Sequence, residues 1–238
     1  MKSDKILLYI ALRLALSYLA KIFDPLGWLT PVTVTAKIFI QNLWKQQLEW
    51  DLPLEEKLTT EWKQFMLSLP VLKNAKIPRW FEMSENSIIQ LHGFVDASEK
   101  AYAAVVYLKV ESKITIIAAK SKLNPIKNRK TLPKLELCAA HLLSKLLQKN
   151  KGVLTTATSI YAWSYSMITL AWIKNPKNKD KFIRNRVMDT VERVPDARWG
   201  YVKSKETPAD MGSRGIPPDS LINNELWWKG PEWMVEDE

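Results

Sequence analysis

The spacing of apolar positions divides the chain at about residue 85 into two parts with different periodicity. In the first part apolar residues recur at helical intervals, as in the stripe Leu58, Trp62, Phe65 and Leu69. Such a stripe is typical of an amphipathic helix that buries one face. The pattern predicts helices over 6–20, 32–50 and 52–72, whose Trp and Met side chains we expect in a core.

In the second part, short alternating apolar runs predict strands over 88–98, 101–110, 113–123, 158–164 and 197–204. Helices are expected over 133–147, 166–174 and within 175–194, and a last short one begins in 207–215. This order of elements predicts an α/β fold, a mixed five-stranded sheet flanked by helices and preceded by a mainly helical segment. We therefore expect a helical connection segment over 1–85, a sheet domain over 86–215 and a Trp- and Pro-rich strap over 216–238.

The charge of the chain changes the picture, because 35 Lys and Arg against 25 Asp and Glu give a formal net charge of +10. Such an excess favours a polyanionic partner, either nucleic acid or an anionic membrane surface. A single cysteine, Cys138, excludes an internal disulfide and fits a reducing, intracellular compartment, cytoplasmic or nuclear. Its apolar neighbours predict a buried, inert thiol. With only His92 and His141 beside it, no zinc-binding spacing exists.

The apolar run from Ile6 to Ala20 follows two lysines and could imitate a signal peptide. Arg13 interrupts this run, which is also shorter than the roughly 18 residues of a membrane span. We expect a buried amphipathic helix there, and no other segment is long enough to cross a membrane.

Three acidic residues stand at element ends in the alternating part of the chain. Asp96 ends an apolar run, Glu136 lies near the start of a predicted helix, and Asp210 lies in the motif KETPADMGSRG. Carboxylates from separate elements can converge on divalent metal ions, and such ions support phosphodiester hydrolysis. An isolated acid is more often solvated or caps a helix, which is how we interpret Glu99, Glu111 and Asp180.

Several ordered motifs carry a family resemblance from Arg13 almost to the end of the chain. They are the stretch from Arg13 to Trp44, then IPRW, FVDASEKAYAAVVYL, LPKLELCAA, RNRVMDTV, KETPADMGSRG and LWWKGPEW. Together they resemble the polyprotein of BEL/Pao-type LTR retrotransposons, the Pao retrotransposon peptidase family, from the reverse-transcriptase connection through the ribonuclease H region. Motifs of a protease, a polymerase and an integrase zinc module are absent, so the sequence looks like a polyprotein fragment.

The resemblance implies a ribonuclease H-like fold in which four carboxylates hold two Mg²⁺ ions, or Mn²⁺, against the scissile phosphate. Asp96, Glu136 and Asp210 match three of these ligands, and Tyr165 stands where the third aspartate is expected. A phenol with a pKa near 10 supplies no anionic oxygen at neutral pH, so we expect weak metal binding and impaired hydrolysis. Tyr201 also replaces a histidine that the family usually has.

Two basic clusters flank these acids and predict contacts to the backbone of an RNA/DNA hybrid or another nucleic acid. Individual lysines in them are equally well explained as solvated residues of loops and helix faces. The first cluster comprises Lys120, Lys122, Lys127, Arg129, Lys130 and Lys134, and the second Lys174, Lys177, Lys179, Lys181, Arg184 and Arg186.

The sequence leaves alternatives open. The chain could be an active Mg²⁺-dependent nuclease in which a nearby acid or water replaces the missing ligand. It could be a host-recruited module that binds protein, or a decayed open reading frame. Domains of this kind often depend on a polymerase, which would here act in trans.

Overall fold

The structure, a computed structural model, describes residues 11–77, 84, 87–154, 158–176 and 180–235. Within this part of the chain five strands form one sheet, in the order β3-β2-β1-β4-β5. The strands are β1 (Ile89–Ala97), β2 (Ala101–Val110), β3 (Lys113–Leu123), β4 (Thr158–Ser164) and β5 (Arg198–Tyr201). β1, β2 and β3 pair antiparallel, whereas β4 runs parallel to β1 and β5 parallel to β4. The predicted mixed sheet is confirmed.

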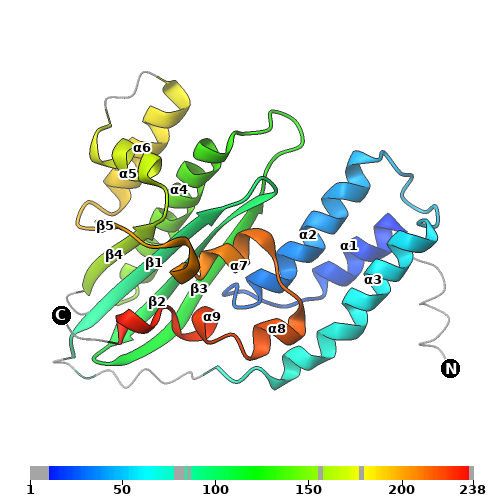
Figure 1. Cartoon of the computed structure of the whole chain (residues 1–238), viewed down its shortest axis with the longest axis horizontal. Helices are drawn as coiled ribbons and strands as arrows, with labels where there is room; N and C mark the ends of the chain where they lie inside the picture. Colours follow the sequence, from blue (N-terminus) through cyan, green and yellow to red (C-terminus); the bar gives the residue numbers. More distant parts are fainter. Residues whose placement is uncertain (1–10, 78–83, 85–86, 155–157, 177–179, 236–238) are drawn as a thin grey trace.

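Helices cover both faces of this sheet (Figure 1). One face packs on α4 (Leu132–Lys151), with α5 (Met167–Lys174) and α6 (Lys181–Arg193) beside it. The other face packs on α7 (Ala209–Arg214), which contacts both β1 and β2. Leu91, Val95 and Leu143 lie in the core on the α4 side, and Phe94, Val105 and Met211 in the core on the α7 side. Alternate residues of β1 therefore point to opposite cores.

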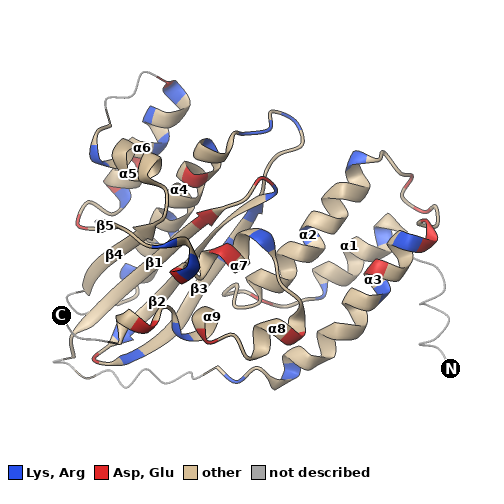
Figure 2. Ribbon diagram, viewed as in Figure 1, with Lys and Arg blue, Asp and Glu red and all other residues tan. Residues whose placement is uncertain are grey.

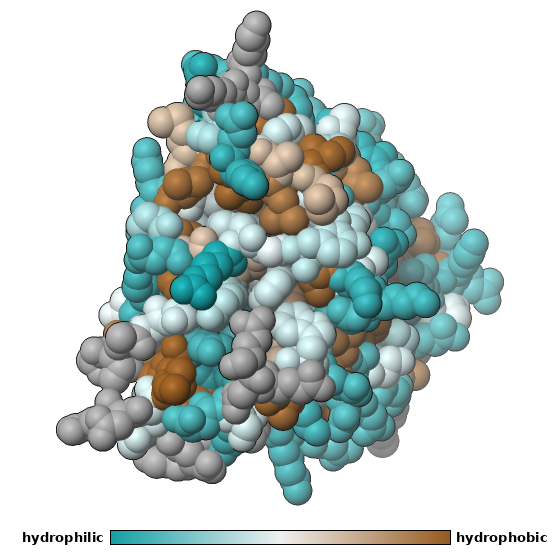
Figure 3. Space-filling view, turned by 60° about the vertical axis from the view of Figure 1, so that its left-hand side comes forward, coloured by the Kyte–Doolittle hydropathy of each residue, from teal (hydrophilic) through white to brown (hydrophobic). Residues whose placement is uncertain are grey.

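The surface over β4, β5 and α5 comes forward in Figure 3, where brown apolar patches alternate with teal hydrophilic ones. Two α5 side chains contribute exposed apolar surface, Met167 at 64% and Ile168 at 49%. None of the helices formed by the described residues is long and apolar enough to span a membrane. The first part of the apolar run at the amino end, residues 6–10, lies outside the described residues.

The amino-terminal part contains α1 (Leu12–Ala20), α2 (Thr30–Lys45), α3 (Glu56–Ser68) and a 3₁₀ helix over Leu69–Asn74. The helix predicted over 32–50 is too long at its carboxyl end. Gln47 has a φ of 53°, in the left-handed region, and so the backbone leaves the helix before Trp50. Trp62 is buried as expected, at 1% exposure. Trp44 and Trp50 are 51% and 43% exposed and pack edge to face, so for these two the expectation of a core position is wrong.

Two glycines let this amino-terminal part approach the sheet closely. Gly27 has a φ of +77°, and a Cβ there would lie 1.8 Å from the carbonyl oxygen of Ala119 on β3. Gly215, after α7, has a φ of +85°, and its Cβ would lie 2.2 Å from the hydroxyl oxygen of Thr35 on α2. At both positions an L side chain would be strained and would also clash.

The carboxyl-terminal residues form α8 (Pro218–Ile222), α9 (Glu225–Lys229) and a 3₁₀ turn over Glu232–Met234. Trp227 is fully buried, and its indole nitrogen donates to the carbonyl oxygen of Trp28 at 2.9 Å. The hydroxyl of Tyr107 donates in turn to the carbonyl oxygen of Trp227 at 2.7 Å. Residues of all three predicted segments share this core, and the division at 85 and 215 stays a prediction.

The strand predicted over 158–164 has the observed bounds, whereas the helix predicted over 133–147 is longer. α4 continues to Lys151, four residues beyond the predicted end. Gln148, Lys149 and Asn150 lack the apolar character on which the prediction depended, yet Leu147 and the residues before it keep the helix packed on the sheet. Cys138 is buried in α4 as expected, and burial is the main cause that raises the pKa of its thiol.

Candidate carboxylate site

Asp96 lies near the carboxyl end of β1, the central strand, and only 2% of its surface is exposed. Its Oδ2 accepts a short hydrogen bond from the hydroxyl of Ser213 on α7. The pKa of this carboxyl is raised to about 6, mainly by burial. The charges of Asp210 and Glu136 contribute to the rise, whereas the hydrogen bond from Ser213 and the charge of Arg214 oppose it. Asp96 is therefore a desolvated acid close to two other carboxylates.

Glu136 comes from the first turns of α4 and is 7% exposed. The Tyr165 hydroxyl, directly after β4, donates to its Oε1 at 2.7 Å. The hydroxyl of Ser166 donates a short hydrogen bond to its Oε2. Burial raises the pKa of Tyr165, and the hydrogen bond to Glu136 and the charges of Glu136 and Asp96 raise it further. The phenol therefore stays protonated and holds the carboxylate as a hydrogen-bond donor.

Asp210 lies in the first turn of α7, half-buried, and its Oδ1 accepts a hydrogen bond from the Nε of Arg214. The same guanidinium acts electrostatically on Asp96 and Tyr165. Figure 2 shows the acidic positions of β1, α4 and α7 near one another, with basic residues at the end of α7. The structure thus brings Asp96, Glu136 and Asp210 together from three elements.

This arrangement does not fit the four-carboxylate, two-ion site that the family resemblance implies. Within the described residues, no group of three or more His, Cys, Asp and Glu side chains is placed to hold a metal ion. Each acid of the trio instead accepts a hydrogen bond from a neighbour: Ser213 for Asp96, Tyr165 and Ser166 for Glu136, Arg214 for Asp210. The donors to this trio are three hydroxyl groups and one guanidinium.

The predicted basic residues separate into two surroundings. Lys120 and Lys122 lie on β3 and face a groove between α4 and α2, whereas Lys127 and Arg129 lie on the exposed loop before α4. Arg129 pairs with Glu99 at 3.5 Å. Lys177 and Lys179 fall outside the described residues, and Arg184 is exposed on α6.

Members of both predicted clusters meet around the ring of Phe182 on α6. The guanidinium of Arg186 lies 3.5 Å from the ring centroid, and the ammonium groups of Lys134 and Lys130 lie 5.2 and 5.8 Å from it. Lys134 also pairs with Asp180 at 2.9 Å. Asp180 accepts from the backbone N–H of Phe182 and Ile183 and so caps α6, in agreement with its interpretation as a solvated or capping acid.

Sequence reasoning missed Ser166, Ser213 and Arg214, the side chains that satisfy the acids. Their positions carried a signal, because Ser166 follows Tyr165 directly and Ser213 and Arg214 lie one helical turn after Asp210. Hydroxyl residues beside buried acids are candidates for their hydrogen-bond donors.

A central β1 bearing a buried aspartate, antiparallel β2 and β3, and an α4 that brings a glutamate to the same end define a ribonuclease H-like domain. A family model described as "Pao retrotransposon-like RNaseH-like domain" matches residues 12–166. The chain belongs to this Pao retrotransposon family. The match includes Asp96, Glu136 and Tyr165 and ends before Asp210.

Solved structures similar to the chain share only weak likeness with it. Ribonuclease H1 from Halobacterium salinarum is 15% identical, with 58% of this chain and 97% of that one covered and a TM-score of 0.39. LC11-RNase H1 in complex with RNA/DNA hybrid is 15% identical, with 51% and 91% covered and a TM-score of 0.39. The foamy viral protease-reverse transcriptase in complex with dsDNA is 15% identical, with 79% and 40% covered and a TM-score of 0.45. No curated protein sequence matches the chain.

Proposed function

We propose that this retroelement ribonuclease H-like domain binds nucleic acid, in particular RNA/DNA hybrid, and that its hydrolytic chemistry is strongly impaired at Tyr165. The observation that carries the proposal is the hydrogen bond of 2.7 Å from the Tyr165 hydroxyl to Glu136. Tyr165 thus places a neutral hydrogen-bond donor beside Glu136, a carboxylate that a metal-dependent nuclease would use to bind its cation.

The chemistry of the phenol supports the proposed impairment of hydrolysis. Burial and the nearby acids raise the pKa of Tyr165, so its oxygen carries no negative charge at neutral pH. Loss of one electrostatic stabiliser typically costs about 10²–10³ in rate, and loss of a metal costs more. The remaining trio of Asp96, Glu136 and Asp210 would take Mg²⁺ or Mn²⁺ weakly.

Binding of nucleic acid is supported by positive charge next to the site. Lys130, Lys134 and Arg186 gather at Phe182, close to the amino end of the helix that bears Glu136. The formal net charge of +10 acts in the same direction. Such contacts fix a phosphate backbone without reading sequence, and the affinity they supply falls with salt. A polymerase domain in trans would position the hybrid.

The test is cleavage of a labelled RNA/DNA hybrid with Mg²⁺ or Mn²⁺ by the wild type, Tyr165→Asp and Tyr165→Asp/Asp96→Asn. We expect little or no cleavage by the wild type and a gain of about 10²-fold or more in Tyr165→Asp, because the substitution restores an anionic ligand. The double variant should lose this gain, which ties the activity to the carboxylate site.

A second measurement concerns metal binding itself. Added Mg²⁺ should raise the melting temperature of Tyr165→Asp more than that of the wild type, since a ligand that binds the folded state stabilises it. A wild type that cleaves the hybrid, and that Asp96→Asn inactivates, would show instead that three carboxylates suffice.

A further inference from the structure

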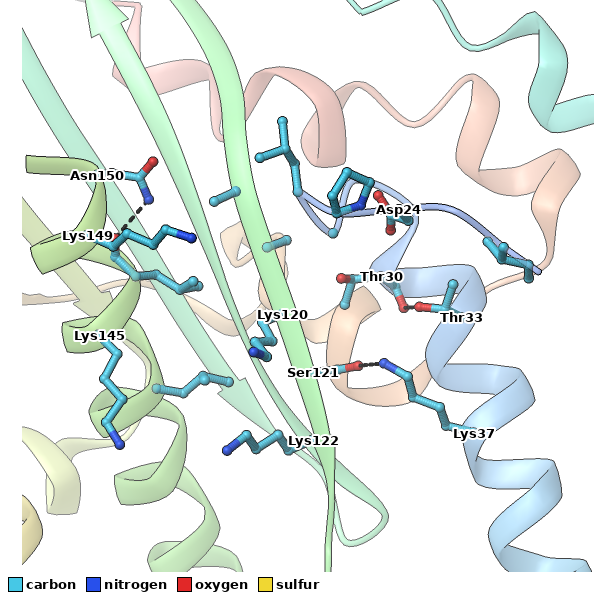
Figure 4. A pocket seen from close by; sticks show the side chains of 18 of the residues that line it. Asp24, Thr30, Thr33, Lys37, Lys120, Ser121, Lys122, Lys145, Lys149 and Asn150 are labelled. Atoms are coloured by element: carbon cyan, nitrogen blue, oxygen red, sulfur yellow. Dashed lines mark hydrogen bonds between the residues drawn. The ribbon is translucent and has the colours of Figure 1, made fainter. Parts of the chain in front are cut away.

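A groove lined by lysines lies between α4 and α2, and the predicted carboxylate chemistry does not involve it. Its volume is about 570 Å³, and β3 forms its floor with Ala118, Ala119 and Ser121. Among the described residues that line it are five lysines, Lys37, Lys120, Lys122, Lys145 and Lys149. Figure 4 shows them on both sides of β3, with Lys145 and Lys149 on α4, Lys37 on α2, and Lys120 and Lys122 between the two helices.

Positive charge in this groove is nearly uncompensated. Asp24 is the acid that lines it, and both oxygens of Asp24 accept backbone N–H groups, from Trp28 and Leu29 at 2.9 Å. In the described part of the chain, none of the five lysines forms an ion pair with a carboxylate. Burial is the main cause that lowers the pKa of Lys37. The charge of Asp24 opposes this shift, and the charge of Lys120 adds to it. These ammonium groups would gain from an added anion.

The groove is separate from the carboxylate site. Lys145 and Lys149 follow Glu136 by nine and thirteen residues on α4, which places them about 14 and 20 Å along the helix axis. Nine residues also rotate the side chain by about 180°, so the lysines lie on the opposite side of the helix from the glutamate. A ligand of the groove therefore does not have to contact Asp96, Glu136 or Asp210.

The groove continues into an apolar hollow of about 340 Å³ that shares Leu19 and Lys37 with it. Lys37, Gln41 and Trp44 lie four and three residues apart along α2, which puts them on one stripe of the helix. Trp44 is 51% exposed at the end of this stripe, and Ile126, which also lines the hollow, is 44% exposed. A row of lysines that ends at an exposed aromatic ring is suited to bind a single strand of nucleic acid. The phosphates of such a strand can contact the lysines while its unpaired bases stack on the ring.

We propose that this lysine groove binds a single strand of nucleic acid, with the phosphodiester backbone along the lysines and an unpaired base against Trp44. The proposal rests on the proposed function only in that nucleic acid is the ligand of both. It adds a second site on the opposite side of α4, and this site needs no metal. A duplex keeps its bases stacked inside and would offer nothing to the apolar hollow.

The test is fluorescence anisotropy of the full chain with a labelled oligo(dT) of about 20 nucleotides and with an RNA/DNA hybrid of equal length, at about 50 to 300 mM salt. We expect Lys120→Ala/Lys145→Ala/Lys149→Ala to weaken oligo(dT) binding about tenfold or more. Three lost phosphate contacts should also reduce the salt slope by about 2. The matched control is Lys57→Ala/Lys73→Ala/Lys76→Ala, which removes three exposed lysines elsewhere and should change affinity less than about twofold.

Trp44→Ala separates stacking from charge. It should weaken oligo(dT) binding about fivefold or more and leave the salt slope unchanged, because it removes a ring and no cation. Equal losses in the groove and control triple variants would overturn the proposal, as would binding of anionic lipid vesicles in place of oligo(dT). Circular dichroism melts of each variant confirm that it is folded.

The two sites can fail separately. Lys130→Ala/Lys134→Ala/Arg186→Ala should weaken the hybrid and spare oligo(dT). If oligo(dT) binds through the groove while no hybrid binds, the proposed function is wrong and the groove stands. If the hybrid binds and the groove triple variant changes neither ligand, the groove proposal is wrong and the proposed function stands.

Discussion

The charged side chains near the two ends of α4 differ in whether the protein itself provides their partners. Near its amino end, buried Glu136 accepts hydrogen bonds from Tyr165 and Ser166, and its neighbour Asp96 accepts one from Ser213. Near its carboxyl end, Lys145 and Lys149 are exposed in the groove and form no ion pair with the described residues. The acids are satisfied within the protein, whereas the lysines are left for a partner. Charges that the fold leaves without a partner indicate a binding surface more directly than charges that already have hydrogen-bond donors within the protein.

The largest effect is expected from the loop that closes the lysine groove. Gly27→Ala forces a Cβ to within 1.8 Å of the Ala119 carbonyl oxygen at a φ of +77°. We expect a loss of about 3 kcal/mol or more in the free energy of unfolding, measured by urea denaturation. Gly152→Ala at the end of α4 is the control, since its Cβ would meet nothing closer than 3.5 Å. Equal losses in both variants would mean that the loop does not dock as described.

Asp96→Asn tests the buried acid that lies near Glu136 and the amino end of α4. The folded-state pKa of about 6 lies above the ordinary 3.8, so the stabilising contribution of Asp96 is present below about pH 4 and is lost as the pH rises through about 6. Asparagine keeps an acceptor for Ser213 and carries no charge. We expect it to stabilise the protein by about 1–3 kcal/mol near pH 7.5 and not near pH 4, in denaturation curves at both pH values. A pH-independent difference would contradict the assigned shift.

Tyr165→Phe removes the donor to Glu136 and leaves the ring. Because a buried carboxylate oxygen loses its partner, we expect a loss of about 1–2 kcal/mol in the free energy of unfolding. Tyr201→Phe is the matched control: its side chain is 54% exposed and the change should cost less than about 0.5 kcal/mol. Thermal melts of the two variants side by side give the comparison. If Tyr165→Phe is as stable as the wild type, a water molecule donates to Glu136 in place of the phenol.

The smallest effect on stability is expected from Lys145→Gln/Lys149→Gln. These side chains are exposed and pair with no described carboxylate, so their loss should change the free energy of unfolding by less than about 0.5 kcal/mol. Any change should be a stabilisation that fades with added salt, since like charges are removed from one groove. A clear destabilisation would show that the lysines support the fold and would weaken the contrast between the two ends of α4.

Local patterns predicted the sheet well, and for a physical reason. The run TSIYAWS is bounded by polar residues and became β4 with the expected ends, because alternation and β-branched or aromatic content act within a few residues. The end of α2 was predicted too late, since the left-handed Gln47 depends on packing that no local pattern encodes.

The acids of the carboxylate site were found because motifs mark them, whereas their partners and the lysine groove were not. Lys37, Lys120 and Lys149 lie on three elements far apart in the sequence, and only folding brings them to one groove. The same limit applies to the ring of Phe182, where two basic clusters that are separate in the sequence meet. Charge counts predicted that cations would gather, but their positions depend on tertiary structure.

The hydrogen bond from Trp227 to the carbonyl oxygen of Trp28 joins residues 199 positions apart. During synthesis the core on the α7 side therefore stays incomplete until Trp227 has left the ribosome, and until then Trp28, Tyr107 and Phe94 lack this packing partner. Such long-range closure makes folding slow and exposes apolar surface to aggregation in the meantime. Loss of Trp227 would therefore remove the partner of both Trp28 and Tyr107 and leave this core open.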